Sequence, residues 1–270
     1  MRRDPTELAL AIRRSVLKMT SKGQASHVGS CLSVTDILAV LYGEVLNIDP
    51  TRPEWAERDR MIVSKGHAAA AVYAVLAELG FFPSNWLLNY GSPGSPLLGH
   101  VSHTIAGIEL STGSLGLGLP VGAGLSLAAK RSRQEWRSFV VLSDGELNEG
   151  SNWEAALFAA HHGLDNLIAI VDYNKLQGFG RTGEVLELEP LAEKWRAFGW
   201  ETLEVDGNDV ADLTNVLNNI QPFTSRPTSI IAHTVKGKGV SFMENRLEWH
   251  YMTPNEEQLR DALTELDKKV

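Results

Sequence analysis

The sequence predicts an α/β fold in which helices cover both faces of a mostly parallel central sheet. From about residue 139 onward, short apolar segments alternate with segments of helical periodicity, which is typical of βαβ units. The strand candidates are apolar at nearly every position, as expected for strands buried on both faces. The length of 270 residues allows one large domain or two small ones. Because no repeat or low-complexity linker divides the chain, we expect a single domain spanning residues 1–270.

The first part of the chain is predicted to be mostly helical. A first helix follows a candidate N-cap at Thr6, and a candidate capping box at residues 33–36 opens a second helix that runs to about Leu46. The apolar positions of the first helix are Leu8, Ile12, Val16 and Met19. Residues 61–64 are predicted as a buried strand and residues 68–79 as a helix. Residues 83–103 are rich in Gly, Pro and Ser and are predicted as a long loop, which in a compact domain is usually functional.

Four further strands and three helices are predicted in the second half. The strands are residues 139–142, 167–171, 200–205 and 228–232, and the helices are residues 152–162, 191–198 and 210–220. Ligands of parallel sheets bind beyond the carboxyl ends of the strands. Three of these ends carry polar residues, namely Asp144, Asn174 and His233.

Composition and charge exclude several classes of function. The net charge of -8 argues against a nucleic-acid partner, which would favour a basic surface. The single cysteine, Cys31, excludes an intrachain disulfide, fits a reducing compartment and is interpreted as a packed residue. The N-terminus lacks an apolar signal core, and no window approaches the ~18 apolar residues of a membrane span. We therefore expect no membrane association and a cytoplasmic location.

Asp144 and Asn174 are the first candidates for chemistry. Both follow strands that we expect to be neighbours, so a carboxylate and an amide oxygen should meet at one edge of the sheet. Gly145 allows a tight turn and the close approach of a ligand. Mg²⁺ prefers such hard oxygen ligands together with phosphate oxygens and water. The alternative is that both residues merely end strands, because Asp and Asn favour turns.

The pattern of Asp144-Gly145 followed some thirty residues later by Asn174 resembles the motif of thiamine-diphosphate enzymes. In that family the Asp and Asn side chains bind a divalent metal, Mg²⁺ or in its place Ca²⁺ or Mn²⁺. The carbonyl two residues after the Asn, here Leu176, is the third protein ligand. Ser143 replaces the first Gly of the family motif, a small change that should keep the turn. The resemblance implies the three-layer α/β/α thiamine-diphosphate-binding fold.

Five further segments are similar to those of transketolases, and they follow the family order over nearly the whole chain. The resemblance implies that His67 contacts the cofactor diphosphate, and that His250 touches both diphosphate and substrate. It also implies that His27 and His100 face the substrate. The Gly-rich segment at residues 111–116 would cover the thiazolium and pyrimidine parts of the cofactor. The cofactor-binding residues so implied are His67, Gly113, Ser114, Leu115, Gly145, Glu146, Asn174 and His250.

Some of these assignments have alternatives in the sequence itself. A lone His is more often structural, and only the coincidence of several matched segments reverses that expectation. His103 lies close to His100 and competes for its role, since the family's Gly-His-Pro reads Gly-His-Val here. The Gly-rich segment also looks like a dinucleotide loop, but no clear strand precedes it. The three histidines that match no segment, His161, His162 and His233, are interpreted as structural.

Glu146 and Glu149 follow the candidate metal ligand Asp144. Glu149-Gly150 matches a family pair whose Glu lies at the dimer interface and bonds to the catalytic Glu of the other chain, so Glu149 is grouped with the catalytic residues. Either glutamate can instead serve as a favourable charge at a helix N-terminus, and this is the simpler interpretation for Glu146.

The resemblance implies a transferase that moves a two-carbon ketol unit from a ketose to an aldose. In transketolases the carboxylate that activates the aminopyrimidine lies in a second domain. The sequence stops near Lys268, so we expect a separate C-terminal partner chain and an assembly of two copies of each chain. A thiamine-diphosphate subunit of a 2-oxo acid decarboxylating complex and a non-catalytic binding subunit remain alternatives. The sugar substrate, and whether it is phosphorylated, stay open.

Overall fold

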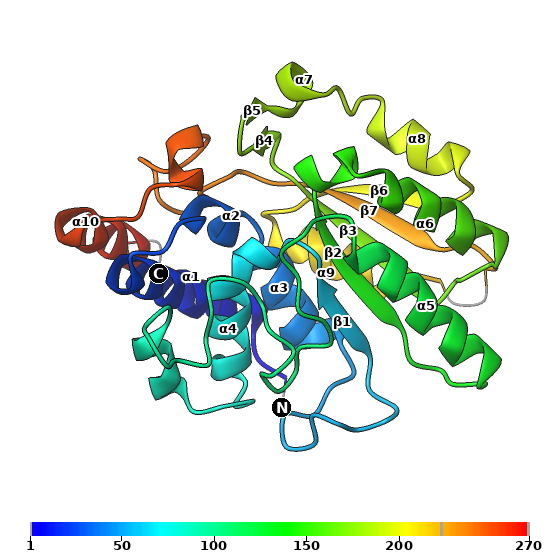
Figure 1. Ribbon diagram of the computed structural model, residues 1–270, viewed down its shortest axis with the longest axis horizontal. Coiled ribbons are helices and arrows are strands. Elements are labelled where there is room, and N and C mark those ends of the chain that lie inside the picture. The colour runs from blue at the N-terminus through cyan, green and yellow to red at the C-terminus, as the bar shows by residue number, and fades with distance from the viewer. Residues whose placement is uncertain (1, 222–223, 269–270) are drawn as a thin grey trace.

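The computed structural model describes residues 2–221 and 224–268, and its centre is a five-stranded parallel sheet (Figure 1). The spatial order is β1-β2-β3-β7-β6, and every neighbouring pair is parallel. The strands are β1 Arg60–Val63, β2 Ser138–Ser143, β3 Leu167–Tyr173, β6 Glu201–Asp206 and β7 Thr228–His233. A separate antiparallel hairpin joins β4 Leu176–Gln177 to β5 Gly180–Arg181. The predicted fold class and all five predicted strands are confirmed.

Helices cover both faces of the sheet. One face packs against α1 Pro5–Gly23, α2 Val28–Ser33, α3 Thr35–Val40, α4 Ala69–Glu78, α9 Val210–Asn218 and α10 Glu256–Asp267. The other face packs against α5 Gly118–Arg131, α6 Gly150–His161 and α8 Leu191–Ala197. A one-turn helix, α7 Thr182–Val185, follows the hairpin.

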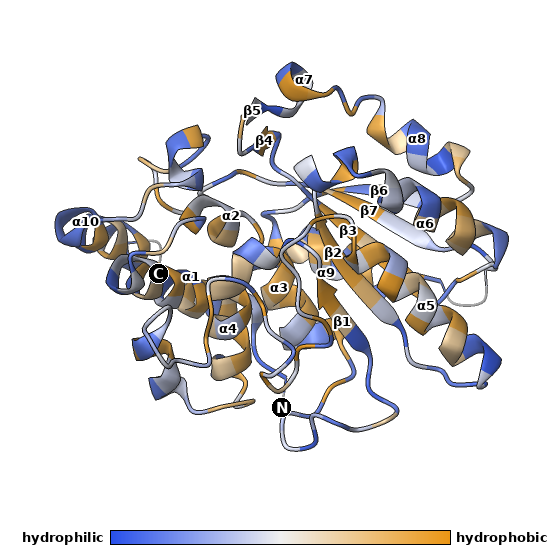
Figure 2. Cartoon of the chain, viewed as in Figure 1, coloured by the Kyte–Doolittle hydropathy of each residue, from blue (hydrophilic) through white to orange (hydrophobic). Residues whose placement is uncertain are grey.

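Strand β2 shows how the sequence builds this arrangement. Its residues alternate between the two cores, because successive side chains of a strand point to opposite faces. Phe139 and Val141 belong to the core under α1–α4, whereas Val140 and Leu142 belong to the core under α5 and α6. A strand buried on both sides must be apolar throughout, and Figure 2 shows the central strands in apolar colours.

Several helix boundaries differ from the sequence-based prediction. Asp4 rather than Thr6 caps α1, because its carboxylate accepts a hydrogen bond from the N–H of Glu7 at 3.0 Å. The predicted capping box at residues 33–36 is wrong: Ser33 ends α2, and the predicted helix consists of α3 followed by a π-helical turn at Leu41–Val45. Its Asp36 is instead buried against the Arg13 guanidinium at 2.6 Å.

Two long helices, α5 and α10, were not predicted from the sequence, and neither were the short helices α2 and α7. α5 follows the Gly-rich segment directly and itself contains several glycines, so its helical pattern is weak. α10 begins at a capping box between Asn255 and Gln258, a signal that the sequence does contain. Within residues 2–221 and 224–268, no helix combines the length and apolar character needed to cross a membrane.

Candidate active site at the carboxyl ends of the strands

The predicted site residues meet in a pocket of about 280 Å³ beyond the carboxyl ends of β2 and β3. Parallel pairing of these strands places Ser143 beside Asp172, so Asp144 and Asn174 leave the sheet at the same edge. The predicted residues that line the pocket are His27, His67, His100, Gly113, Leu115, Asp144, Gly145, Asn174, Leu176 and His250. The structure therefore brings together ten of the thirteen predicted site residues.

Three oxygens in this pocket form a donor set suited to a hard divalent cation. The Asp144 carboxylate is only 2% exposed and accepts hydrogen bonds from the N–H groups of Gly145 (2.7 Å) and Lys175 (2.5 Å). The Asn174 amide oxygen accepts from the N–H of Leu176 at 3.1 Å. The Leu176 carbonyl accepts from the Lys236 ammonium at 2.7 Å, so it already faces a positive charge.

Burial raises the pKa of Asp144 to about 6, and the nearby carboxylate of Asp172 acts in the same direction. The N–H of Gly145 partly opposes this shift. A desolvated carboxylate whose charge is disfavoured gains most from a bound cation. Among the described residues no group of three or more His, Cys, Asp or Glu side chains could hold a metal ion.

Four histidines gather in the same pocket. The ring of His27 lies 5.1 Å from His67, 6.0 Å from His100 and 5.0 Å from His250, measured between centroids. Segments from four parts of the chain bring them together: His27 precedes α2, His67 lies in the turn before α4, His100 lies in the long loop and His250 ends the 3-10 turn Leu247–His250. The long loop is held in place because the Tyr73 hydroxyl donates to the His100 carbonyl at 2.8 Å.

The surroundings of His27, His67 and His250 favour the neutral imidazole. Burial lowers the pKa of His27 to about 4 and that of His250 to about 3, and it holds the pKa of His67 well below 6.5. Neighbouring cationic groups add to each shift, in particular Lys236 and Lys65. A neutral imidazole can accept a proton or a hydrogen bond on one nitrogen and donate from the other.

Two buried lysines are functional candidates that the sequence analysis missed. Lys236 is 1% exposed and contacts His250 Nδ1 at 2.9 Å as well as the Leu176 carbonyl. Lys65 is fully buried, forms an ion pair with Asp172 and donates to the Ser30 carbonyl at 3.2 Å. The only sequence signal for Lys65 was its place inside the Ser-Lys-Gly-His segment. Lysine is ordinarily a surface residue. The charge of Lys65 is compensated within the chain by Asp172, whereas Lys236 contacts only neutral groups in its hydrogen bonds and so leaves a positive charge at the pocket.

Glu146 lies behind the pocket and is not part of its lining. Its buried carboxylate accepts hydrogen bonds from the Ser64 hydroxyl, from the N–H of Gly116 at 2.8 Å and from the N–H of Ser143 at 3.2 Å. It thereby ties the Gly-rich segment to the ends of β1 and β2. Burial raises its pKa, and these hydrogen bonds oppose the shift.

Ser114 and Glu149 are exposed residues at the edge of the site. Neither lines the pocket, and Glu149 precedes α6 without capping it through its side chain. Glu149 packs closely on the Gly-rich segment, since a Cβ on Gly116 would lie 2.7 Å from the Glu149 Cβ. Its carboxylate forms no hydrogen bond or ion pair with any residue in the described ranges.

The remaining histidines stay outside the pocket. His103 is exposed and contacts the Ser111 hydroxyl at 2.7 Å, so the structure places His100 and not His103 in the site. His233 ends β7 and contacts Glu204 at 3.0 Å. His161 and His162 lie at the end of α6.

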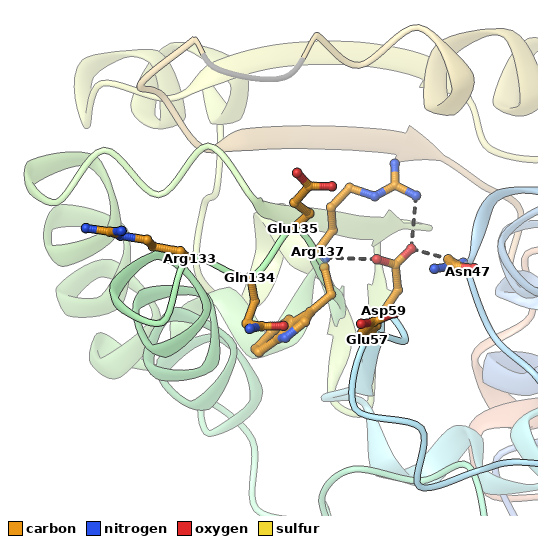
Figure 3. Close-up of a pocket in the computed structure, with 8 residues that line it drawn as sticks. Asn47, Glu57, Asp59, Arg133, Gln134, Glu135 and Arg137 are labelled. Atoms are coloured by element: carbon orange, nitrogen blue, oxygen red, sulfur yellow. Dashed lines mark hydrogen bonds and ion pairs between the residues drawn. The ribbon is translucent and has the colours of Figure 1, made fainter.

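A larger cavity of about 560 Å³ lies at the other end of the sheet, near the start of β2 (Figure 3). Its Asp59 is satisfied by groups of the chain itself: the N–H of Asn47 at 3.0 Å, and the N–H and guanidinium of Arg137 at 2.8 and 3.0 Å. These contacts join the loop before β1 to β2. Asp59 therefore has a structural role, and its carboxylate is already paired within the chain.

Comparison with known proteins decides the family. Residues 5–267 match the family model described as transketolase, thiamine diphosphate binding domain. The chain belongs to the transketolase family. It is 48% identical over 260 residues to an apulose-4-phosphate transketolase subunit of Actinobacillus succinogenes, covering 96% of this chain and 94% of that one. It is 41% identical over 262 residues to a 6-deoxy-6-sulfo-D-fructose transketolase subunit of a Clostridium species, covering 97% and 95%.

Solved transketolases share the fold. The enzyme from Leishmania mexicana superposes with a TM-score of 0.91 at 27% identity, and that from Campylobacter jejuni with 0.90 at 30%. The matches cover 99% and 97% of this chain but only 42% of each transketolase. The family and fold predicted from the sequence are confirmed, and the chain corresponds to less than half of a single-chain transketolase.

Proposed function

We propose that this chain is the cofactor-binding subunit of a two-chain transketolase. The observation that carries the proposal is the meeting of Asp144, Asn174 and the Leu176 carbonyl with the histidine cluster in one pocket. We propose that residues 1–270 act as one cofactor-binding unit. Thiamine diphosphate, when bound, supplies the chemistry by stabilising a carbanion next to a former carbonyl.

The divalent cation would be held by the Asp144 carboxylate, the Asn174 amide oxygen and the Leu176 carbonyl. Mg²⁺ suits these ligands, with Ca²⁺ or Mn²⁺ as substitutes. His67 would donate to the diphosphate, and Gly145 would let it approach the backbone. A side chain at Gly145 would clash, since a Cβ there lies 2.8 Å from the Gln177 Cβ. Gly113, Ser114 and Leu115 would cover the cofactor from the other side, with Glu146 holding that segment in place.

His27, His100 and His250 would act on the substrate. Imidazole rings can hydrogen-bond sugar hydroxyls and pass protons to and from them. Lys236 fixes the orientation of the His250 ring by contacting Nδ1, so Nε2 is the ring nitrogen that would contact the substrate. A Cβ built on Gly178 would lie 3.3 Å from His250 Nε2, so this glycine keeps the space beside the ring open.

The activating carboxylate would come from a partner chain. Two relatives that match nearly end to end are named as transketolase subunits, which supports a separate partner for this chain. We propose that the partner docks on the surface formed by α5 and α6, since exposed apolar residues lie on or next to these helices and Glu149 immediately precedes α6. These residues are Leu117, Val121, Leu157 and Phe158. Glu149 would meet a glutamate of the partner, in an assembly with two copies of each chain.

The substrate would be a ketose with an anionic group at its far end, and the acceptor an aldose. The relatives' names mention a sugar 4-phosphate and a sulfonated sugar, which share this property. The partner subunit would provide the groups that bind the anionic end.

The test combines the purified chain with its partner, Mg²⁺ and thiamine diphosphate. Ketose phosphates, sulfonated ketoses and pyruvate are compared as donors. We expect two-carbon transfer to an aldose from a ketose donor, and loss of cofactor binding with retained fold in the Asp144→Ala variant. Release of CO₂ from pyruvate without ketol transfer would favour a 2-oxo acid decarboxylating enzyme instead. Absence of cofactor binding in the wild-type complex would refute the proposal.

A further inference from the structure

Gln177 is a residue of the pocket to which neither the sequence nor the family comparison assigns a role. It lies in β4, directly after Leu176, and lines the pocket together with Asp144 and Gly145. Its Nε2 is buried and has no hydrogen-bond partner among the residues that the structure describes. Buried amide donors are almost always paired, so an unpaired one in a pocket requires an explanation.

Exchanging the two amide atoms does not resolve this. Gln177 Oε1 likewise forms no hydrogen bond with any residue in the ranges 2–221 and 224–268. A glutamine that only filled space would leave a polar group desolvated without compensation, which costs stability and which a leucine would avoid. The side chain is thus suited to a partner from outside the chain.

The backbone around Gln177 holds the side chain in position. Gln177 pairs with Gly180 across the hairpin, and the next residue, Gly178, accepts a hydrogen bond from the Tyr251 hydroxyl at 3.0 Å. On its other side the stem of Gln177 packs against Gly145. A donor that is already fixed loses little conformational freedom when it binds.

The surrounding charges identify the class of partner. Gln177 follows Leu176, whose carbonyl accepts from the Lys236 ammonium, and it packs on the residue next to Asp144. A neutral N–H donor in a pocket that this ammonium also lines suits an acceptor-only anionic group, such as a phosphoryl oxygen. A ligand consisting only of cations would be repelled by Lys236 and would not use an amide donor.

We propose that the Gln177 amide donates a hydrogen bond to the diphosphate of the cofactor and sets the affinity for it. This inference rests on the proposed function, because it needs thiamine diphosphate in the pocket. It adds a positioning donor beside the residues already assigned to the metal. If the amide instead bound the phosphate of a sugar substrate, its loss would change the KM for the ketose and leave the Kd for thiamine diphosphate unchanged.

The test is titration calorimetry on the chain with its partner, using Mg²⁺ with thiamine diphosphate and, separately, with inorganic pyrophosphate. Gln177→Met keeps the stem that packs on Gly145 and removes the donor. Gln177→Glu keeps the shape and replaces the donor with a charge that repels phosphate. Gln134→Met is the matched control, an exposed glutamine at the other end of the sheet. Thermal unfolding of each variant without ligand shows whether the fold is kept.

We expect Gln177→Met to raise the Kd for both ligands roughly ten- to a hundredfold, the effect of losing a hydrogen bond to a charged group. Gln177→Glu should raise it further, and Gln134→Met should leave it unchanged. The KM for the ketose at saturating cofactor should stay within about twofold of the wild type. A Kd for Gln177→Met within twofold of the wild type would overturn the inference, and so would a change confined to the ketose KM. If the wild type itself binds neither ligand, the proposed function fails first.

Discussion

The buried ion pair between Lys65 and Asp172 offers the sharpest prediction about the floor of the pocket. Both side chains are 0% exposed. Asp172 also accepts from the Ser33 hydroxyl at 2.6 Å and from the Thr234 hydroxyl. The network thus joins α2, the end of β1, β3 and the segment after β7, which are the elements that support the pocket.

Replacing Lys65 with Met removes the ammonium and leaves the Asp172 carboxylate buried with only two hydroxyl donors. Breaking one side of a buried pair costs about 3–5 kcal/mol, because the remaining charge is desolvated without compensation. That is a large part of a typical unfolding free energy of about 5–15 kcal/mol. Lys65→Met combined with Asp172→Asn removes both charges and keeps an acceptor for the hydroxyls. The double variant should therefore regain about half of the loss.

Urea unfolding of the ligand-free chain, followed by far-UV circular dichroism, measures these free energies. The two single variants and the double variant complete a cycle, whose coupling energy should be about 2 kcal/mol or more. A loss of less than about 1 kcal/mol in Lys65→Met, or additive effects in the cycle, would refute the reasoning that the two charges depend on each other.

Two further predictions concern packing and pH. Gly118→Ala should destabilise the chain by about 1–3 kcal/mol, because its Cβ would lie 2.4 Å from the Ser64 side chain. Gly124→Ala on the same helix is the control, because no atom lies within 4 Å of a Cβ built there. Urea unfolding should show that this variant gains about 0.5–1 kcal/mol of unfolding free energy. A change of the same sign in both variants would contradict the geometry. Because the pKa of His27 falls from about 6.5 to about 4 on folding, the unfolded state binds more protons between these values and stability declines as pH falls through this window. His27→Asn should reduce the slope of unfolding free energy against pH in this window by up to about 1.4 kcal/mol per pH unit. The raised pKa of Asp144 acts in the opposite sense, but it is common to the wild type and the variant. Equal slopes for the wild type and the variant would count against a buried neutral His27.

The strands of the sheet and most of the residues that line the pocket were predictable from the sequence, for physical reasons that can be traced to single residues. Strands such as β2 are apolar at every core position, which only a doubly covered parallel sheet requires. Asp144 and Asn174 follow adjacent strands, so chain geometry alone brings them together. The helix pattern of α5 was hidden by its glycines, which allow close contact with β1 and β2.

The buried polar groups could not be predicted. Lys65 and Lys236 belong to a residue type that is usually exposed, and their burial depends on contacts between segments up to 107 residues apart. The buried amide nitrogen of the half-buried Gln177 leaves no sequence signal either. Residues 33–36 have the residue types of a capping box, but the Asp36 carboxylate instead accepts hydrogen bonds from the guanidinium of the distant residue Arg13. Local patterns therefore fail where long-range electrostatic contacts decide the structure.

The central claim is that Asp144, Asn174 and the Leu176 carbonyl hold the metal that binds the cofactor diphosphate. A crystal structure of the complex with Mn²⁺ and thiamine diphosphate, with anomalous data for manganese, tests it most directly. We expect one anomalous peak per chain at bonding distance from these three oxygens and from the diphosphate. A peak elsewhere, or a bound cofactor whose diphosphate lies away from Asp144, would contradict the account.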